Sequence, residues 1–374
     1  MTSPSRRDVP ARPEQAASSR PAGLPAPRPE FSLREGYHSP QVAVEVRLNT
    51  NESPFPPPDG WLEALVEELR SIEFHRYPDR AAWGLRKALA DLHGVVPEAV
   101  FCANGSNEVL QTLCLAYGGA GRTALTFEPT YALHSHIAHL TGTGVVEEQR
   151  RDDFTLDPAV VRAALARSQP AITFLCSPNN PTGRADDRSM VEQVLAEAPG
   201  LVVVDEAYGQ FADWSAIDLV ADDRPLVVTR TYSKTWAMAA VRLGYLIGPP
   251  GVVEVLERVA LPYHLDAVKQ AAGRLAVRFT DEMERRVATI VSERARLLDG
   301  LQRLGMTTWP SQANFVLWRP PDRPAAAVWR GLLDHSVLVR DCSSWPRLEG
   351  CLRVTIGTPA ENDRFLAALA EVVA

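Results

Sequence analysis

Hydrophobic and polar positions follow two patterns over most of the chain. Short, continuously apolar runs are separated by segments in which apolar residues recur every three or four positions. Continuously apolar runs predict strands that are buried on both faces, and the segments between them predict the covering helices. We therefore expect an α/β fold with a mostly parallel, doubly wound sheet, whose ligands bind beyond the carboxyl ends of the strands. The runs are AVFCA (99–103), TALTF (123–127), AITFLC (171–176), LVVVD (201–205), LVVTR (226–230) and LGYLIG (243–248).

The pattern changes in the last third of the chain. A helical segment of mixed charge, at roughly 276–303, precedes three further strand-like runs, and a capping box of Thr358 and Glu361 starts a final helix. This predicts a smaller α+β C-terminal domain at 276–374 after a large domain at 57–275. The three runs are ANFVLW, SVLVRDC and CLRVTIG.

The first 56 residues have a different composition. Residues 1–30 are rich in Pro, Ala, Ser and Arg, which predicts a disordered tail, and residues 31–56 are expected to form an N-terminal arm. A transit peptide is a weaker interpretation of the tail, because Asp8 and Glu14 are unusual in such a segment.

Composition argues against partnership with nucleic acid, a membrane or a metal ion. A formal net charge of -7 implies no basic face for nucleic acid. No run approaches the roughly 18 apolar residues that cross a membrane. The five cysteines have no CxxC pair and no metal-ligand spacing, so we expect buried reduced thiols, a cytoplasmic location and no bound metal.

Polar side chains follow four of the predicted strands. After AVFCA, Gly105 permits a tight turn, and Ser106 and Asn107 open a helix whose first N–H groups suit a phosphate. AITFLC is followed by the turn SPNNPTG, which presents Asn179 or Asn180. Taken alone, each feature is better explained by an ordinary turn or helix cap.

The next two strands end in ionisable groups. Asp205 ends a buried strand and needs a cationic partner, and Tyr208 lies three residues further on. Lys234 follows LVVTR, flanked by Ser233 and Thr235. A single lysine is usually a solvated charge, and a lone buried aspartate usually pairs with a structural arginine.

Four such strand ends at one edge of a sheet predict a site for pyridoxal phosphate. Lys234 would bond to the cofactor aldehyde, and Asp205 would keep the ring nitrogen protonated so that the ring withdraws electrons. Asn180 and Tyr208 would bond to the ring oxygen. The residues that would hold the phosphate are Ser106, Asn107, Ser233 and Arg242.

The chain resembles the histidinol-phosphate aminotransferase family, within the fold-type I aminotransferases, from about residue 46 to the C-terminus. This resemblance implies pyridoxal phosphate as cofactor, small-molecule amine and oxo-acid substrates, and transfer of an amino group between histidinol phosphate and 2-oxoglutarate. It is carried by RLNTNESP (47–54), RYPD (76–79), NGSNE (104–108), FEPTY (127–131), CSPNNPTG (176–183), VDEAY (204–208), the SK pair followed by Arg242, and GCLRVTIGT (350–358).

The resemblance also implies roles for individual residues. Lys234, Asp205 and Tyr208 would be catalytic. Tyr131 would stack on the cofactor ring, and Tyr77 would reach the cofactor phosphate of a partner subunit, which makes the enzyme a homodimer. The residues implied to bind the substrate are Arg353, at its anionic end, Asn51 and Asn180.

Two positions depart from the family pattern and leave the substrate open. The run MAAVR has Ala240 where the family commonly has glycine, and Trp236 stands where phenylalanine is frequent. Both changes are expected to add bulk beside the cofactor. Transamination of an aromatic amino acid, decarboxylation and β-elimination therefore remain alternatives on the same cofactor site.

Other function classes fit the sequence less well. A nicotinamide-dependent dehydrogenase would need a GxGxxG motif after the first strand, and NGSNE does not provide one. A non-catalytic regulator would need an added DNA-binding domain, for which the tail is too short. On a helix, His136 and His139 point about 200° and 140° away from His134, so we expect the three on the surface rather than around a metal. A substrate-facing position for one of them is the less favoured alternative.

Overall fold

The structure is a computed structural model that describes residue 25 and residues 42–374. The predicted tail, apart from residue 25, and residues 31–41 of the predicted arm lie outside the described residues. No helix in the described part of the chain is long and apolar enough to span a bilayer.

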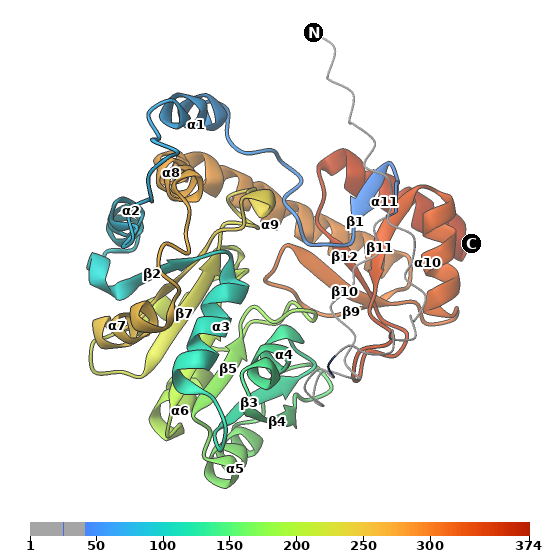
Figure 1. Cartoon of the computed structure of the whole chain (residues 1–374). Coiled ribbons are helices and arrows are strands. Elements are labelled where there is room, and N and C mark those ends of the chain that lie inside the picture. The colour runs from blue at the N-terminus through green and yellow to red at the C-terminus, as the bar shows by residue number, and fades with distance from the viewer. Residues whose placement is uncertain (1–24, 26–41) are drawn as a thin grey trace. The chain divides into compact units, whose positions relative to one another are not determined.

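A seven-stranded sheet forms the centre of the larger part of the fold (Figure 1). Its order is β2-β8-β7-β6-β5-β3-β4, and every neighbouring pair is parallel except the two that involve β8. The mostly parallel sheet is therefore confirmed. The strands are β2 (Val100–Ala103), β3 (Thr123–Glu128), β4 (Gly144–Gln149), β5 (Ile172–Cys176), β6 (Leu201–Asp205), β7 (Leu226–Thr231) and β8 (Gly244–Ile247).

All six predicted runs form strands of this sheet, and β4 is the strand that the pattern missed. β4 lies at the edge beside β3, and its residues Gly144–Gln149 are exposed or half-buried throughout. An edge strand of this kind needs no continuous apolar run, because water rather than a helix covers part of it.

Helices cover both faces of the sheet, which explains why its strands are apolar at every position. Along β2, Val100 and Cys102 pack with α1, α2 and α8, whereas Phe101 and Ala103 pack on the opposite face with α3 and α7. α5 and α6 cover the far half of the sheet. The helices are α1 (Trp61–Leu69), α2 (Trp83–His93), α3 (Ser106–Tyr117), α4 (Leu133–Leu140), α5 (Pro158–Ser168), α6 (Arg188–Glu197), α7 (Pro250–Val259) and α8 (Ala267–Ala276).

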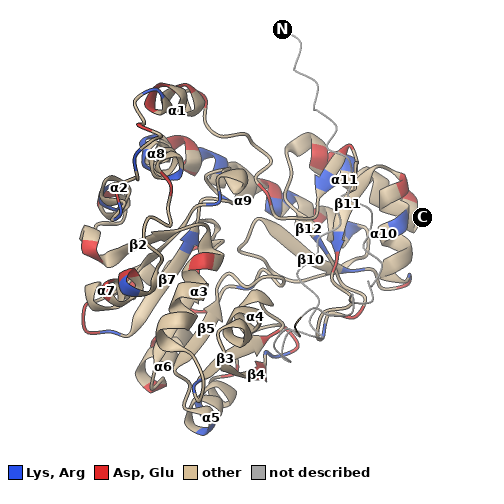
Figure 2. Ribbon diagram, viewed as in Figure 1, with Lys and Arg blue, Asp and Glu red and all other residues tan. Residues whose placement is uncertain are grey.

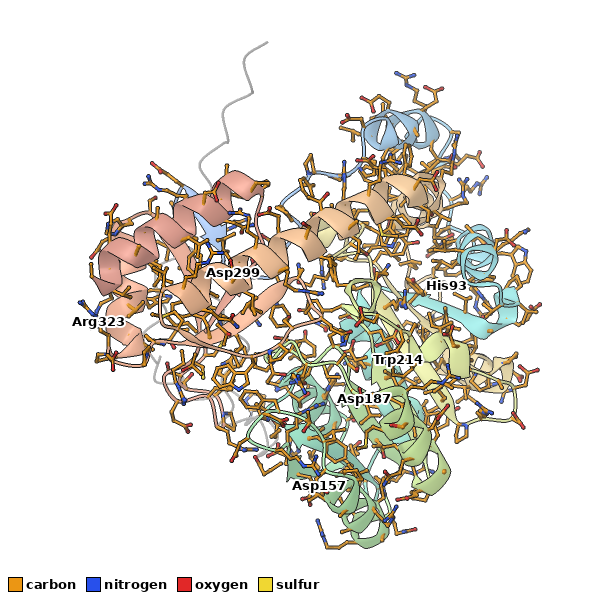
Figure 3. The ribbon with its side chains drawn as sticks, turned by 180° about the vertical axis from the view of Figure 1, so that it is seen from behind. His93, Asp157, Asp187, Trp214, Asp299 and Arg323 are labelled. Carbon is orange, nitrogen blue, oxygen red and sulfur yellow. The ribbon has the colours of Figure 1, made fainter. Side chains whose placement is uncertain are left out.

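Side-chain caps begin several helices. Asp157, labelled in Figure 3, accepts a hydrogen bond from the backbone N–H of Ala159 at 2.8 Å at the start of α5. The predicted capping box of Thr358 and Glu361 is confirmed at the start of the final helix, α11 (Pro359–Val373). Such caps satisfy N–H groups that the first helical turn leaves unpaired.

A second sheet of five strands has the order β1-β11-β12-β10-β9. Its core packs against α9, α10 and α11. The strand β1, from the start of the described chain, pairs in parallel with β11, with Val46 opposite Val337. The elements are β1 (Val46–Leu48), β9 (Thr307–Thr308), β10 (Phe315–Arg319), β11 (Val337–Asp341), β12 (Leu352–Thr355), α9 (Thr280–Arg303), α10 (Ala325–Asp334) and α11 (Pro359–Val373).

Charged and sulfur-bearing side chains are distributed as the composition predicts. Acidic and basic residues are interspersed on the outer helices, and the strands are mostly without charge (Figure 2). All five cysteines are buried free thiols, as expected.

Candidate active site

The predicted site residues follow neighbouring strands at one edge of the seven-stranded sheet. β5, β6 and β7 are adjacent and parallel, with Cys176 opposite Asp205 and Asp205 opposite Thr229. Asn180 follows β5, Asp205 ends β6, and Lys234 follows β7. The strand register thus brings side chains more than 50 positions apart in the sequence to one edge.

Lys234 is a partly buried amine with an altered acidity. Its Nζ donates to the backbone carbonyl of Thr50 at 3.2 Å and lies 5.7 Å from the centre of the Tyr208 ring. Burial lowers the pKa of Lys234 from its ordinary 10.5 to about 7, the positive charge of Arg353 adds to the shift, and Glu52 opposes it. A substantial fraction of this amine is therefore neutral near pH 7, and a neutral amine is a nucleophile and a base.

Asp205 is held by a buried histidine. Its Oδ2 lies 2.9 Å from Nε2 of His134, and its Oδ1 accepts from Thr229 Oγ1 at 3.3 Å. The His134 ring is fully buried and stacks on Phe174, with 4.8 Å between the ring centres. The carboxylate is thus oriented on one side by an imidazole and on the other by a hydroxyl.

The expectation that the three histidines lie on the surface is wrong for His134. The helix α4 packs against the sheet, and His134 lies on the packed side together with Ile137. A signal was present in the sequence. Tyr131, already expected in the site, precedes His134 by three residues, and the backbone N–H of His134 donates to the carbonyl of Tyr131 in the turn that leads into α4. Their rings meet edge to face at 5.4 Å.

Residues of the N-terminal arm reach the same site from β1. Asn51 donates through Nδ2 to the hydroxyl of Tyr208 at 3.0 Å. Thr355 of β12 both donates to Asn51 Oδ1 at 3.1 Å and accepts from its backbone N–H at 3.0 Å. The arm therefore connects Tyr208 with the strand that carries Arg353.

The predicted phosphate-binding residues form a cradle. Arg242 donates to Ser233 Oγ at 3.3 Å. Gly105 has a φ of +84°, which favours glycine, and Arg242 Nη2 approaches within 2.9 Å of the place where a Cβ would lie. The helix α3 begins at Ser106, and Asn107 accepts from the Tyr131 hydroxyl at 3.1 Å. Helix N–H groups, a hydroxyl and a guanidinium fit the phosphate of the predicted cofactor.

Two arginines lie side by side on β11 and β12. Arg340 is directly opposite Arg353 in the antiparallel pair. Arg353 donates to Asn180 Oδ1 at 2.5 Å and to the carbonyl of Asn49 at 3.0 Å, and its Nε has no partner among the described residues. Arg340 is not among the predicted site residues, although it directly follows the apolar run VLV (337–339), as Asp205 and Lys234 follow theirs. An anionic group suits such a pair.

Other predicted residues lie away from these contacts. Tyr77 is 81% exposed, and its ring stacks on Tyr263 with 4.5 Å between centres, so a single chain does not bring it to Lys234. Asn179 is fully buried and bonds to Thr182 and to the carbonyl of Pro129, so it stabilises the turn and leaves Asn180 to face the site.

The two departures from the family pattern also lie outside the site contacts. Trp236 is only 1% exposed, and its ring stacks on that of Tyr232 in the core beneath α2 and α8. The large Trp236 side chain is therefore accommodated in the core, and not beside the cofactor site as expected. Ala240 is exposed.

Comparison with known proteins extends over nearly the whole described chain. The model of the family "Aminotransferase class I and II" matches residues 43–369. The histidinol-phosphate aminotransferase of Frankia casuarinae is 48% identical over 349 residues, covering 89% of this chain and 86% of the relative. That of Thermobifida fusca is 46% identical over 343 residues, covering 89% and 91%. The structure of histidinol-phosphate aminotransferase from Sinorhizobium meliloti in complex with pyridoxal-5'-phosphate matches with a TM-score of 0.79 and 26% identity, covering 88% and 91%.

Proposed function

Because the chain belongs to the class I and II aminotransferases, we propose that it uses pyridoxal phosphate to transfer the amino group of histidinol phosphate to 2-oxoglutarate. The observation that carries this proposal is the shared environment of Lys234 and Arg353. The guanidinium of Arg353 is close enough to help lower the pKa of the Lys234 amine. A substrate with an anionic end and an amino group can therefore place its anionic end at Arg353 and its amino group near Lys234.

The buried arginine pair favours a phosphate-bearing amine over an aromatic amino acid. Histidinol phosphate carries a dianionic phosphate, and Arg340 and Arg353 lie opposite each other in position to share it. An aromatic amino acid offers only one carboxylate. In the second half of the reaction, a carboxylate of 2-oxoglutarate takes the place of the phosphate at Arg353.

The cofactor supplies an aldehyde for the amino group and a ring that withdraws electrons from the reacting carbon. The protein residues orient it and move protons. Asp205, held by His134, would keep the ring nitrogen protonated, Asn180 and Tyr208 would bond to the ring oxygen, and Tyr131 would stack on the ring. Lys234 Nζ removes the proton from the substrate carbon that bears the amino group. The residues that would hold the cofactor phosphate are Ser106, Asn107, Ser233 and Arg242.

The working enzyme is proposed to be a cytoplasmic homodimer. Tyr77 is 81% exposed and stacks on Tyr263. Phe74, three residues before Tyr77, is 71% exposed, and Leu261, two residues before Tyr263, is 77% exposed. Apolar surface of this kind is typical of a protein interface. A second copy would cover this surface and would receive Tyr77 at its cofactor phosphate. We also propose that the large domain ends at residue 275 and the small domain begins at residue 276, at the C-terminal end of α8.

The test is glutamate formation by the purified holoenzyme from histidinol phosphate and 2-oxoglutarate. We expect turnover with the wild-type protein and a loss of roughly 10²-fold or more in Lys234→Ala, because the proton carrier is removed. Lys87→Ala, on the exposed face of α2, is the matched control and should retain full activity.

The choice of substrates decides between the alternatives. Phenylalanine and tyrosine are tested as competing amines, and release of CO₂ is followed in parallel. Silence with histidinol phosphate but rapid glutamate formation from an aromatic amino acid contradicts the proposed substrate. Release of CO₂ without glutamate contradicts transamination.

A further inference from the structure

The loop between β11 and β12 places an aromatic ring against both arginines of the anion site. Trp345 lies with its ring centre 5.4 Å from Cζ of Arg340 and 5.9 Å from Cζ of Arg353. On another side, the Arg353 guanidinium lies 5.1 Å from the centre of the Phe315 ring. Arg353 thus contacts two aromatic rings, and one of them is shared with Arg340.

The Trp345 ring reduces the electrostatic repulsion between Arg340 and Arg353. Arg340 and Arg353 are 8% and 3% exposed, and they are directly opposed on neighbouring strands, so two positive charges are brought together in a poorly solvated place. The face of an indole ring attracts a guanidinium, most strongly where water is excluded. One ring in contact with both cations offsets part of their repulsion and fixes their relative placement.

The loop that carries Trp345 is anchored at several points. Arg347 donates to Asp152 Oδ1 at 2.7 Å and to the backbone carbonyl of Arg150. Leu348 packs in a buried cluster with Phe154, and Trp345 packs against the same cluster. These contacts join the loop to residues 150–154, which follow β4 of the large sheet. The position of the Trp345 ring therefore depends on the large sheet as well as on β11 and β12.

On the basis of the proposed function, we propose that Trp345 is a specificity-determining residue that positions Arg340 and Arg353 to bind the phosphate of the amino substrate in preference to a carboxylate. A phosphate dianion has three terminal oxygens and can accept hydrogen bonds from both guanidinium groups. A carboxylate has two oxygens and is satisfied by one bidentate arginine. Loss of the ring therefore weakens phosphate binding more than carboxylate binding.

The first test compares Trp345→Leu, which keeps apolar packing without the ring, with Trp345→Phe, which keeps a ring. For Trp345→Leu we expect the KM for histidinol phosphate to rise about tenfold. The KM for 2-oxoglutarate and kcat should change by less than about twofold, since a single arginine serves the carboxylate. Trp345→Phe should restore most of the lost affinity.

The matched control is Trp309→Leu. Trp309 packs against the same buried cluster, and its ring lies 5.7 Å from Cζ of Arg319, which is exposed and outside the anion site. This variant removes the same kind of contact at a place outside the anion site. Both KM values should therefore stay unchanged. Equal losses for both substrates in Trp345→Leu, or no loss at all, overturn the proposal.

A binding measurement separates this proposal from the proposed function. Inorganic phosphate and succinate are titrated into the holoenzyme by calorimetry, which requires no turnover. Trp345→Leu should weaken phosphate binding about tenfold and leave succinate binding unchanged. If the wild-type enzyme does not turn over histidinol phosphate, the proposed function fails, and the selective loss of phosphate binding still decides the role of Trp345. An unchanged ratio of the two affinities overturns it.

Discussion

Burial and neighbouring charge give Lys234 and Asp205 their chemical properties. Neither residue type is reactive in itself; Lys87 and Asp91, for example, form an exposed ion pair on α2. Lys234 acquires a lowered pKa because its surroundings are poorly solvated and because Arg353 and Arg242 are close by. Asp205 is oriented by a histidine that is distant in sequence. At this scale the site depends on the neighbours of each group rather than on the group alone.

The lowered pKa of Lys234 predicts its reactivity in the cofactor-free protein. The amine reacts only when neutral, so acylation of Lys234 should rise with pH and reach half its maximum near pH 7. The measurement is brief treatment with an acylating reagent over a pH series, followed by peptide mass spectrometry. The unfolded chain, in which the ordinary lysine pKa of about 10.4 applies, is the reference. A midpoint near 10 in the folded protein contradicts the prediction.

A segment of three residues after β1 connects the two sheets at the site. Thr50 accepts from Lys234, and Asn51 bonds to both Tyr208 and Thr355. Asn51 has a φ of +55°, a left-handed conformation that asparagine adopts more readily than most residues. The pairing of β1 with β11 holds this segment in place, so an element outside the large sheet orients residues at its edge.

Thr355→Val tests this connection. Valine matches threonine in shape but cannot bond to Asn51, which leaves buried polar groups of Asn51 without partners. We expect a loss of about 1–3 kcal/mol in the free energy of unfolding and a lower kcat, because Asn51 no longer orients Tyr208. Denaturant unfolding and steady-state kinetics measure the two effects. Thr355→Ser keeps the hydroxyl and is the control; a valine variant as stable and active as wild type rules out the connection.

At the scale of the whole molecule, the site is proposed to be completed by a second chain. The contacts within one chain account for Lys234, Asp205 and the phosphate cradle, whereas Tyr77 remains on the surface. A dimer of twofold symmetry would place one Tyr77 at each of two equivalent sites.

Complementation between two variants tests the shared site. Tyr77→Ala and Lys234→Ala are co-expressed with different tags, and hybrid dimers are isolated through both tags. Each hybrid contains one site with both substitutions and one intact site, so we expect about half of the wild-type activity at limiting cofactor. Either variant alone should be far less active under the same conditions. Hybrid activity no greater than half that of Tyr77→Ala, or a monomer in solution, contradicts the proposal.

The sequence by itself determined the class of fold and the nature of the cofactor site. Its strands are buried on both faces and so appear as continuous apolar runs, and the residues that carry the chemistry directly follow those runs. Because parallel strands end at one edge of a sheet, local order along the chain already implied that Asn180, Asp205 and Lys234 lie together.

Only the tertiary structure decided the contacts between segments that no local pattern relates. His134 and Asp205 are 71 positions apart, and the packing of α4 on the sheet brings them together. The pairing of β1 with β11 and the placement of Trp345 against Arg340 and Arg353 likewise depend on strand register and loop anchoring. Periodicity reports which face of an element is buried, but it does not report which other element covers that face.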